Sequence, residues 1–379
     1  MLPRAYSRAI AMLIGTIVGA GIFGMPYVFA RAGVAVGAMH MVVLTAAVLL
    51  VHLWFGELTL RTNAHTRLVG YAHRYLGMPG RIIASLSGVL GMWGALVAYI
   101  VLAGTFVHQL GGPLLGGTPW VYSVAFAMFG MLAVAVGLRL IESLEFIFTA
   151  FIFLAIALIA IVGIQRVDPI NFSSMNFRDA FLPYGVVLFS LGGVSAIAEI
   201  RDTLRGWERL LPRAIAWGTI IAAALTALFA VIVVGVSGPR TTEDAILGLA
   251  PTLGQSIVLL GALLGFSTIA TSFLMLGLYT RNVFHYDFRI PRVAALLLGV
   301  GVPVGIFLIG RPGFIDIVML TGALFAGLDG ILVALAVLVA RRRGDRQPEF
   351  RVRLPAVVNY LVAFMFLVGM VVTIRELFG

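Results

Sequence analysis

Long apolar runs separated by short polar segments make up most of the chain. A helix that crosses a bilayer needs about 20 mostly apolar residues. Eleven runs reach this length, and we predict a membrane-spanning helix in each. The predicted helices cover residues 8–32, 36–60, 82–110, 119–138, 143–164, 180–200, 213–237, 246–280, 291–309, 313–340 and 354–377. The runs at 82–110 and 246–280 exceed the minimum, so we expect these two helices to be tilted or to continue beyond the bilayer.

The composition indicates the same class of protein. Of the 379 residues, 61% are hydrophobic and only 11% are charged. A soluble domain is about half apolar and about a quarter charged, so this chain has too little polar surface to cover a water-soluble globule. These values exclude a soluble enzyme and a nucleic-acid-binding protein. The absence of cysteine excludes disulfides and thiolate chemistry.

The basic residues indicate an orientation in the membrane. All 26 are arginine, and the formal net charge is +10. If the N-terminus lies inside and the eleven helices alternate in direction, 20 arginines fall on the inner side and 6 on the outer side. Cytoplasmic loops are enriched in positive charge. We therefore expect a multi-pass protein of the cell (inner or plasma) membrane, with the N-terminus in the cytoplasm and the C-terminus outside.

Two of the predicted helices carry interruptions. Residues 14–26 hold four glycines and Pro26, and glycine costs a helix about 1 kcal/mol, and proline about 3 kcal/mol, relative to alanine. Residues 189–199 hold a second Gly/Ser interruption. Small residues also allow close helix packing, but unpaired backbone at membrane depth is tolerated where it lines a cavity. The two interrupted helices open successive sets of five, which is typical of inverted-repeat transporters.

This arrangement predicts an organisation and a kind of site. We expect a first inverted repeat at 1–164, a second at 165–341, and a loop with an extra helix at 342–379. An unwound helix offers free N–H groups and a positive dipole end to a carboxylate, and its released carbonyl groups can accept hydrogen bonds from an ammonium group. Arginines lie only at the ends of the predicted spans and none in their middle, and the chain has no lysine, so an amino acid zwitterion held mainly by backbone groups is the expected ligand.

The motifs in these two helices resemble those of a known superfamily. Residues 15–26 (GTIVGAGIFGMP) look like the first-helix motif of the amino acid–polyamine–organocation transporters, and residues 27–33 are closer to the amino acid/auxin permease branch and the bacterial aromatic amino acid permeases. Residues 189–195 (FSLGGVS) are similar to the sixth helix of that group. The resemblance implies an all-α LeuT fold: two inverted repeats of five helices plus an extra eleventh helix, helices 1 and 6 broken, and a core bundle of helices 1, 2, 6 and 7.

The resemblance also implies substrate-binding residues. The substrate carboxylate would lie on amide groups near Gly19, Ala20 and Gly21. The amine would face carbonyl groups near Ile17, Phe189 and Ser190, with the Phe189 ring as a gate. Gly192 and Gly193 would leave room for a neutral or aromatic side chain. Tyr99 or Trp93 would line the side-chain pocket, although packing roles are equally compatible with both.

Two kinds of coupling ion remain open. By resemblance, a sodium ion would bind the carbonyl groups of Gly15, Val18 and Thr268 and the hydroxyls of Thr271 and Ser272, although such hydroxyls often bond their own helix instead. Intramembrane carboxylates are candidates for proton coupling, and Glu57, Glu199 and Asp329 fall within predicted spans. The first two are followed closely by arginines, which favours ion pairs at a cytoplasmic gate. Asp329 is the preferred proton site.

We therefore expect a secondary active symporter of neutral or aromatic L-amino acids that works by alternating access, driven by sodium. Proton symport, exchange and uniport are the alternatives. The six histidines are scattered over different spans and loops and match no hydrolase motif, so an enzyme is not expected. No cofactor is expected beyond the transported ion. The expected partners are the amino acid and the lipid bilayer, and the expected assembly is a monomer or a weak homo-oligomer.

Overall fold

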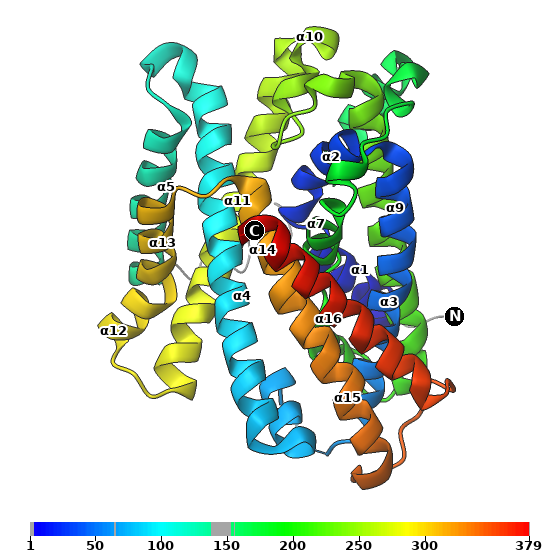
Figure 1. Ribbon diagram of the computed structural model, residues 1–379. Helices are drawn as coiled ribbons and strands as arrows, with labels where there is room; N and C mark the ends of the chain where they lie inside the picture. Colours follow the sequence, from blue (N-terminus) through cyan, green and yellow to red (C-terminus); the bar gives the residue numbers. More distant parts are fainter. Residues whose placement is uncertain (1–3, 64–65, 138–152, 155, 379) are drawn as a thin grey trace.

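The computed structural model describes residues 4–63, 66–137, 153–154 and 156–378, and these form an all-helical bundle (Figure 1). The α-helices are α1 (Arg4–Ile17), α2 (Gly21–Ala32), α3 (Val34–Leu60), α4 (Leu68–Leu115), α5 (Pro119–Val136), α7 (Pro183–Ser190), α8 (Val194–Thr203), α9 (Leu211–Ser237), α10 (Ala250–Leu253), α11 (Gln255–Asn282), α12 (Arg292–Leu296), α13 (Val302–Gly310), α14 (Phe314–Thr321), α15 (Gly327–Arg343) and α16 (Ala356–Phe378). The π-helical turns are η7 (Val283–Asp287), η8 (Leu297–Gly301) and η9 (Gly322–Ala326). The short 3₁₀ turns are η1 (Ile164–Arg166), η2 (Pro169–Phe172), η3 (Phe177–Asp179), η4 (Glu208–Leu210), η5 (Gly238–Arg240) and η6 (Leu247–Leu249).

Ten of the eleven predicted spans have a counterpart in the described part of the chain. Nine helical segments there are long and apolar enough to cross a membrane, and the bent pair α1 and α2 makes a tenth span. Half of the predicted helix at 143–164 lies outside the described residues. Its described end belongs to a shorter apolar helix at Ile156–Arg166.

Two helices start differently from the prediction, and a left-handed glycine lies near each start. The run at 246–280 is not one helix, because Gly254 has a φ of 85° and α11 begins only after it. The helix predicted at 82–110 lies within α4, which begins at Leu68 and is kinked at Gly77, where φ is 71°. Both angles lie in the left-handed region, which glycine adopts without steric cost. Apolar character alone does not reveal such angles.

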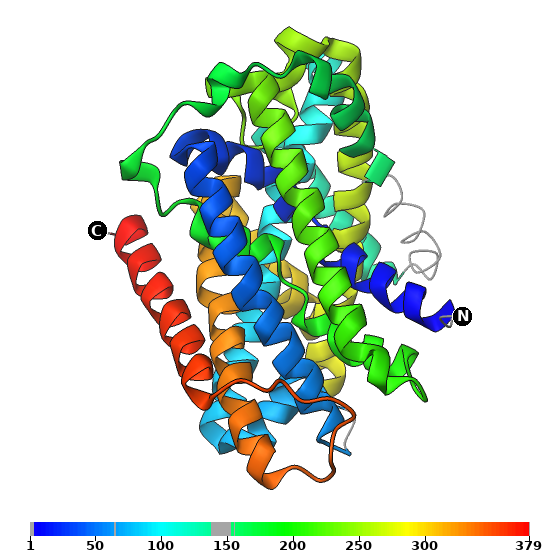
Figure 2. The ribbon, with the colours of Figure 1, turned by 90° about the vertical axis from the view of Figure 1, so that its right-hand side faces the viewer.

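The centre of the molecule is built from the two broken helices and their neighbours. α1 and α2 pack against α9, α3 packs against α8 and α9, and α2 packs against α7. Gly218 of α9 allows this close approach, since a Cβ there would lie 2.8 Å from the Leu13 side chain of α1. Outside this group, α4 packs against α5, α11 and α15, and α16 lies along α15 at the edge of the molecule (Figures 1 and 2).

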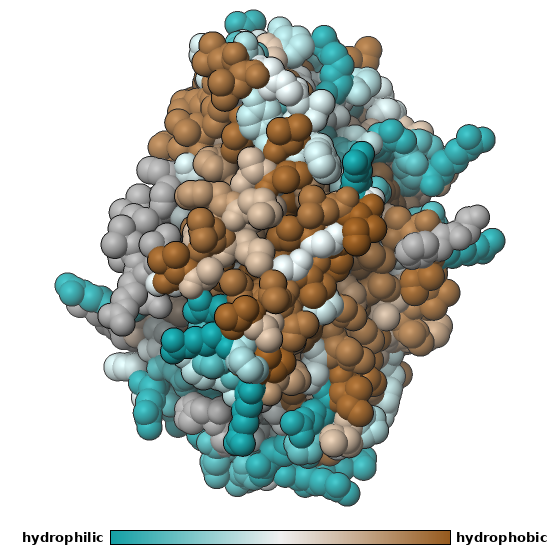
Figure 3. All heavy atoms as spheres, turned by 90° about the vertical axis from the view of Figure 1, so that its left-hand side faces the viewer, coloured by the Kyte–Doolittle hydropathy of each residue, from teal (hydrophilic) through white to brown (hydrophobic). Residues whose placement is uncertain are grey.

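The surface is suited to a bilayer. A broad hydrophobic band crosses the middle of one face, and hydrophilic side chains gather below it (Figure 3). Large apolar side chains point outward from α5, including Phe129 and Leu132, which are 72% and 63% exposed. Soluble monomers rarely expose apolar patches of this extent, because water makes them unfavourable. The chain is a multi-pass membrane protein.

Candidate substrate site between two broken helices

The first break lies between α1 and α2, which meet at an angle of 57°. Residues 18–20 are not helical. The N–H of Gly19 turns back to the carbonyl of Ile17 at 2.9 Å. Among the described residues, no hydrogen bond reaches the carbonyl oxygens of Gly15 and Val18, and the N–H groups of Ala20 and Gly21 donate none. The break therefore presents both donors and acceptors.

The second break lies between α7 and α8. The N–H of Gly192 donates to the carbonyl of Phe189 at 3.2 Å. The first N–H groups of α8, those of Val194 and Ser195, find no acceptor among the residues that the structure describes. Such free groups at a helix start carry the positive end of the helix dipole. The second break thus repeats the chemistry of the first.

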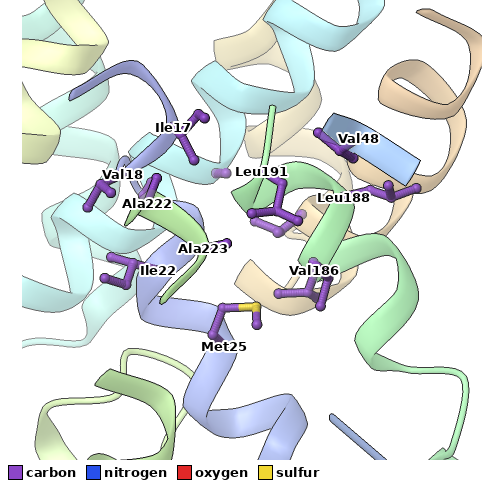
Figure 4. Close-up of a cluster of buried hydrophobic side chains, with 14 of the residues drawn as sticks. Ile17, Val18, Ile22, Met25, Val48, Val186, Leu188, Leu191, Ala222 and Ala223 are labelled. Carbon is purple, nitrogen blue, oxygen red and sulfur yellow. The ribbon is translucent and has the colours of Figure 1, made fainter. Parts of the chain in front are cut away.

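The two breaks are in contact with each other. A Cβ built on Gly21 would lie 2.7 Å from the Cα of Ser190, and one built on Gly193 would lie 2.9 Å from Cγ1 of Ile17. Four of the residues predicted from the sequence are thereby brought together. Apolar side chains that include Ile17, Leu191 and Ala222 surround this junction (Figure 4).

Two other glycines of the same breaks have no contact with the opposite break. A Cβ on Gly19 would meet only the Thr16 carbonyl, at 4.0 Å, and one on Gly192 would meet only backbone carbonyls of its own segment, the nearest at 3.3 Å. The hydroxyl of Ser190 is buried and has no hydrogen-bond partner in the described structure. The Phe189 ring beside it is half-buried. A small zwitterion could use these unpaired donors and acceptors.

A row of exposed residues on α8 extends from this site toward the arginine-rich end of the molecule. A cavity of about 490 Å³ at that end is lined by Arg4, Arg8 and Asp202, among others. Along α8, Ser195 and Glu199 are exposed and lie about two turns and one turn before Asp202, on the same face. The predicted site residue Glu199 therefore lies on the solvent-exposed approach to the break.

The predicted sodium ligands on α11 bond their own helix. The hydroxyl of Thr268 donates to the carbonyl of Leu264 at 3.0 Å, and that of Thr271 donates to the carbonyl of Thr268 at 2.9 Å. Ser272 is half-buried. A hydroxyl that donates its hydrogen in this way keeps oxygen lone pairs for a cation.

The α11 helix faces the broken helix. A Cβ on Gly265, one turn before these hydroxyls, would lie 3.2 Å from the Phe23 ring of α2. The structure thus places the oxygen atoms of α11 on a helix that touches α2.

The remaining predicted carboxylates lie apart from the breaks. Glu57 is fully buried and pairs with Arg61 and with Arg341, at 2.9 Å in each case. Asp329 accepts a hydrogen bond from the Ser87 hydroxyl at 2.7 Å, between α15 and α4.

The two aromatic residues predicted to line the pocket also lie on α4. Trp93 stacks on Phe284, with ring centroids 6.4 Å apart, so it packs near the end of α11. Tyr99 is half-buried against the central core.

His52 is the residue of this region that the sequence analysis missed. Its ring is fully buried on α3, its Nδ1 lies 3.0 Å from the Thr219 hydroxyl, and its Cε1 would lie 3.0 Å from a Cβ on Gly193. Its position inside the apolar run 36–60 was the available signal, because ionisable residues within spans are commonly functional.

An all-helical membrane bundle with two broken helices in contact at its centre defines a transporter of the LeuT-fold class. The structure resembles that of MhsT in complex with L-phenylalanine, with a TM-score of 0.63 over 99% of both chains and a sequence identity of 16%. The model of the tryptophan/tyrosine permease family matches residues 5–376. The chain belongs to this family, a family of transporters and not of enzymes, as the first-helix and sixth-helix motifs predicted.

A curated relative gives a more specific comparison. The chain is similar to the Tyrosine-specific transport system 2 of Haemophilus influenzae, with 26% identity over 237 residues. The match covers 59% of this chain and 56% of the relative, so the chain spans little more than half of that relative's length.

Proposed function

We propose that this protein is a secondary active symporter of aromatic L-amino acids, chiefly tyrosine and tryptophan, that works by alternating access. The family description and the name of the relative support this substrate class. The observation that supports the site most directly is the contact of Gly21 with Ser190, because it joins two segments of unpaired backbone groups. Smaller neutral amino acids are the alternative substrates.

The substrate carboxylate binds the free N–H groups of Ala20 and Gly21 in this proposal. Charge-assisted hydrogen bonds to backbone N–H groups are among the stronger ones available to a carboxylate. The amine binds carbonyl oxygens near Ile17 and Ser190, and the side chain extends into the space beside Gly192. The N–H of Gly19, which the sequence analysis also assigned to the carboxylate, is engaged with Ile17 in this structure.

The proposal includes the repeats, the number of spans and the orientation in the membrane. Two inverted repeats (1–164 and 165–341) of five helices precede an extra helix in 342–379, which makes eleven spans. The arginine-rich end faces the cytoplasm, because positive charge is retained there, and this places the C-terminus outside. The protein works as a monomer or a weak homo-oligomer.

Sodium drives uptake in this proposal. The supporting features are the unpaired carbonyl oxygens of Gly15 and Val18 and the neutral oxygens of Thr268, Thr271 and Ser272, since hard cations prefer oxygen ligands. Proton coupling and ion-independent exchange are the alternatives that the experiment must separate.

Uptake by proteoliposomes tests these points. Labelled tyrosine, tryptophan, phenylalanine and leucine are offered under an inward sodium gradient or an inward proton gradient, imposed separately. We expect the aromatic amino acids to accumulate under sodium. Accumulation under the proton gradient alone would replace sodium with a proton, and counterflow without either gradient would indicate an exchanger. If none of the four amino acids binds or moves, the proposed substrate class is wrong.

A matched pair of variants tests the site. Gly19→Val fills the open space at the first break, whereas Gly88→Val adds the same side chain on α4, where a Cβ meets nothing within 4 Å. We expect uptake to fall at least tenfold in Gly19→Val and to persist in Gly88→Val. Equal uptake by both variants would remove the proposed site.

A further inference from the structure

A buried imidazole lies against the second break. The His52 side chain has no solvent exposure, and its ring packs against Gly193 at the second break. A Cβ on Gly193 would lie 3.0 Å from the ring and also 3.1 Å from the Leu13 side chain, so the ring lies where α1, α3 and α8 meet. His52 stands eight residues before the end of α3, about 12 Å along the helix axis. It is therefore well inside the span.

Only one nitrogen of this ring has a partner. Nδ1 lies 3.0 Å from the Thr219 hydroxyl of α9, while Nε2 is buried and has no hydrogen-bond partner within the described structure. If Nδ1 donates to Thr219, Nε2 keeps its lone pair. A buried polar atom without a hydrogen-bond partner is unfavourable. This cost is retained in the state described, which indicates that Nε2 has a partner in another state.

The charged groups on the helices around α3 are engaged elsewhere or exposed. Glu57, on the same helix, pairs with Arg61 and Arg341. Three further titratable groups on neighbouring elements have partners of their own: Arg31 pairs with Asp179, Tyr184 donates to the Phe366 carbonyl, and Asp329 accepts from Ser87. Arg201 lies beside Tyr71, and Asp202 and several arginines line the pockets at the arginine-rich end. Glu199 and Arg213 are exposed. The known contacts of the His52 ring are thus uncharged: Thr219, Gly193 and apolar side chains.

We propose that His52 binds a proton during the transport cycle and that movement of the second break controls access to it. When α8 moves away from α3, water reaches Nε2, whose lone pair takes a proton from solution to give the imidazolium ion. When the break closes again, the proton must leave, because an unpaired buried charge is unfavourable among apolar groups. This inference rests on the proposed transport function, but it holds whether sodium or the proton drives accumulation.

The proposal predicts a pH dependence that His52 alone causes. Histidine is the side chain that ordinarily changes charge between about pH 5 and 8. We expect wild-type tyrosine uptake, measured with equal pH on both sides and a fixed sodium gradient, to change severalfold across this range. His52→Gln keeps a polar side chain and should give a flat profile. His40→Gln is the matched control, since His40 lies on the same helix and bonds the Val36 carbonyl of its own helix.

A second variant covers the case in which His52→Gln fails to fold. Thr219→Val removes the hydroxyl that supports the protonated ring, and charge-assisted bonds are about twice as strong as neutral ones. We expect the midpoint of its pH profile to move to lower pH by up to about one unit. A pH profile in His52→Gln that matches the wild type, or an unmoved midpoint in Thr219→Val, would overturn the proposal.

A direct measurement separates this inference from the proposed function. When tyrosine is added to detergent-solubilised protein in weak buffer, a pH indicator should report proton exchange in wild type and His40→Gln but not in His52→Gln. Tyrosine binding without proton exchange in the wild type would reject the role of His52 and leave the transport function intact. Absence of binding by any aromatic amino acid would instead reject the proposed function.

Discussion

At the scale of single residues, glycines at the two breaks serve two different purposes. Gly21 and Gly193 are packed against the opposite break, whereas Gly19 has no close neighbour and Gly192 is exposed. The packed positions have no room for a side chain because the nearest atom at Gly21 is on Ser190. The same residue type therefore holds the junction together at one position and exposes it at the next.

This difference predicts opposite effects of one substitution. Gly21→Ala forces the breaks apart, and overpacking of this kind costs about 1–3 kcal/mol. Gly19→Ala meets no such contact and should keep the thermal midpoint of the wild type within a few degrees. Thermal unfolding in detergent, followed for both variants, measures the difference. Equal losses of stability in the two variants would contradict the packing described here.

The unpaired hydroxyl of Ser190 gives a second prediction. Ser190→Ala removes a buried polar atom that has no partner among the described residues, so the free energy of unfolding should stay the same or rise by up to about 1 kcal/mol. If the hydroxyl binds substrate, the same variant should lose about tenfold in tyrosine affinity. Calorimetric titration and chemical unfolding together check both signs. A parallel loss of stability and affinity would indicate a structural hydroxyl instead.

At the scale of elements, a buried carboxylate joins three parts of the chain. Glu57 near the end of α3 pairs with Arg61 and with Arg341 of α15, and it accepts the N–H of Val352, at 3.1 Å, from the segment before α16. These contacts tie α3 and α15 to the loop that follows α15. The sequence indicated the pairing with Arg61, four residues away on one helical face. Arg341 lies 284 residues away, and only the fold brings it there.

Removal of this charge should weaken the bundle. Glu57→Gln leaves two arginines without their counter-charge, and breaking a buried pair in this way costs about 3–5 kcal/mol. Glu199→Gln is the control, because its side chain is exposed and surface changes stay within about 0.5 kcal/mol. Unfolding of the two variants in the same detergent provides the test. Similar stabilities would show that the Glu57 pairs contribute little.

At the scale of the whole molecule, the spans and the broken helices were predictable, whereas the environment of each site residue was not. The lengths of the apolar runs predicted eleven helices, of which ten have a counterpart in the described part of the chain. The glycine-rich motifs located both breaks. Helix ends set by single left-handed glycines, such as Gly254, leave no apolar signal. The role of His52 depends on Gly193 and Thr219, which lie more than 140 residues away in sequence. Contacts of that kind arise only when the helices pack.

The exposed face of α8 predicts that the second break is accessible to water from one side of the membrane only. The chain has no cysteine, so a single introduced thiol can be followed without background. Ser195→Cys lies on the exposed face that leads to the cavity near Arg8 and Asp202, and Ser190→Cys is buried. We expect a membrane-impermeant thiol reagent to label the first variant from the cytoplasmic side only, and to label the second at least tenfold more slowly. Labelling from the outer side would reverse the proposed orientation.

The separation of packed and open glycines has a consequence for how such transporters diversify. In the proposed site, substitutions at Gly19 or Gly192 alter the volume offered to a ligand, while Gly21 and Gly193 keep the two breaks in contact. In this proposal, selectivity and packing depend on neighbouring but distinct positions. Evolution or protein engineering can therefore change which amino acid is accepted without altering the contact between the two breaks.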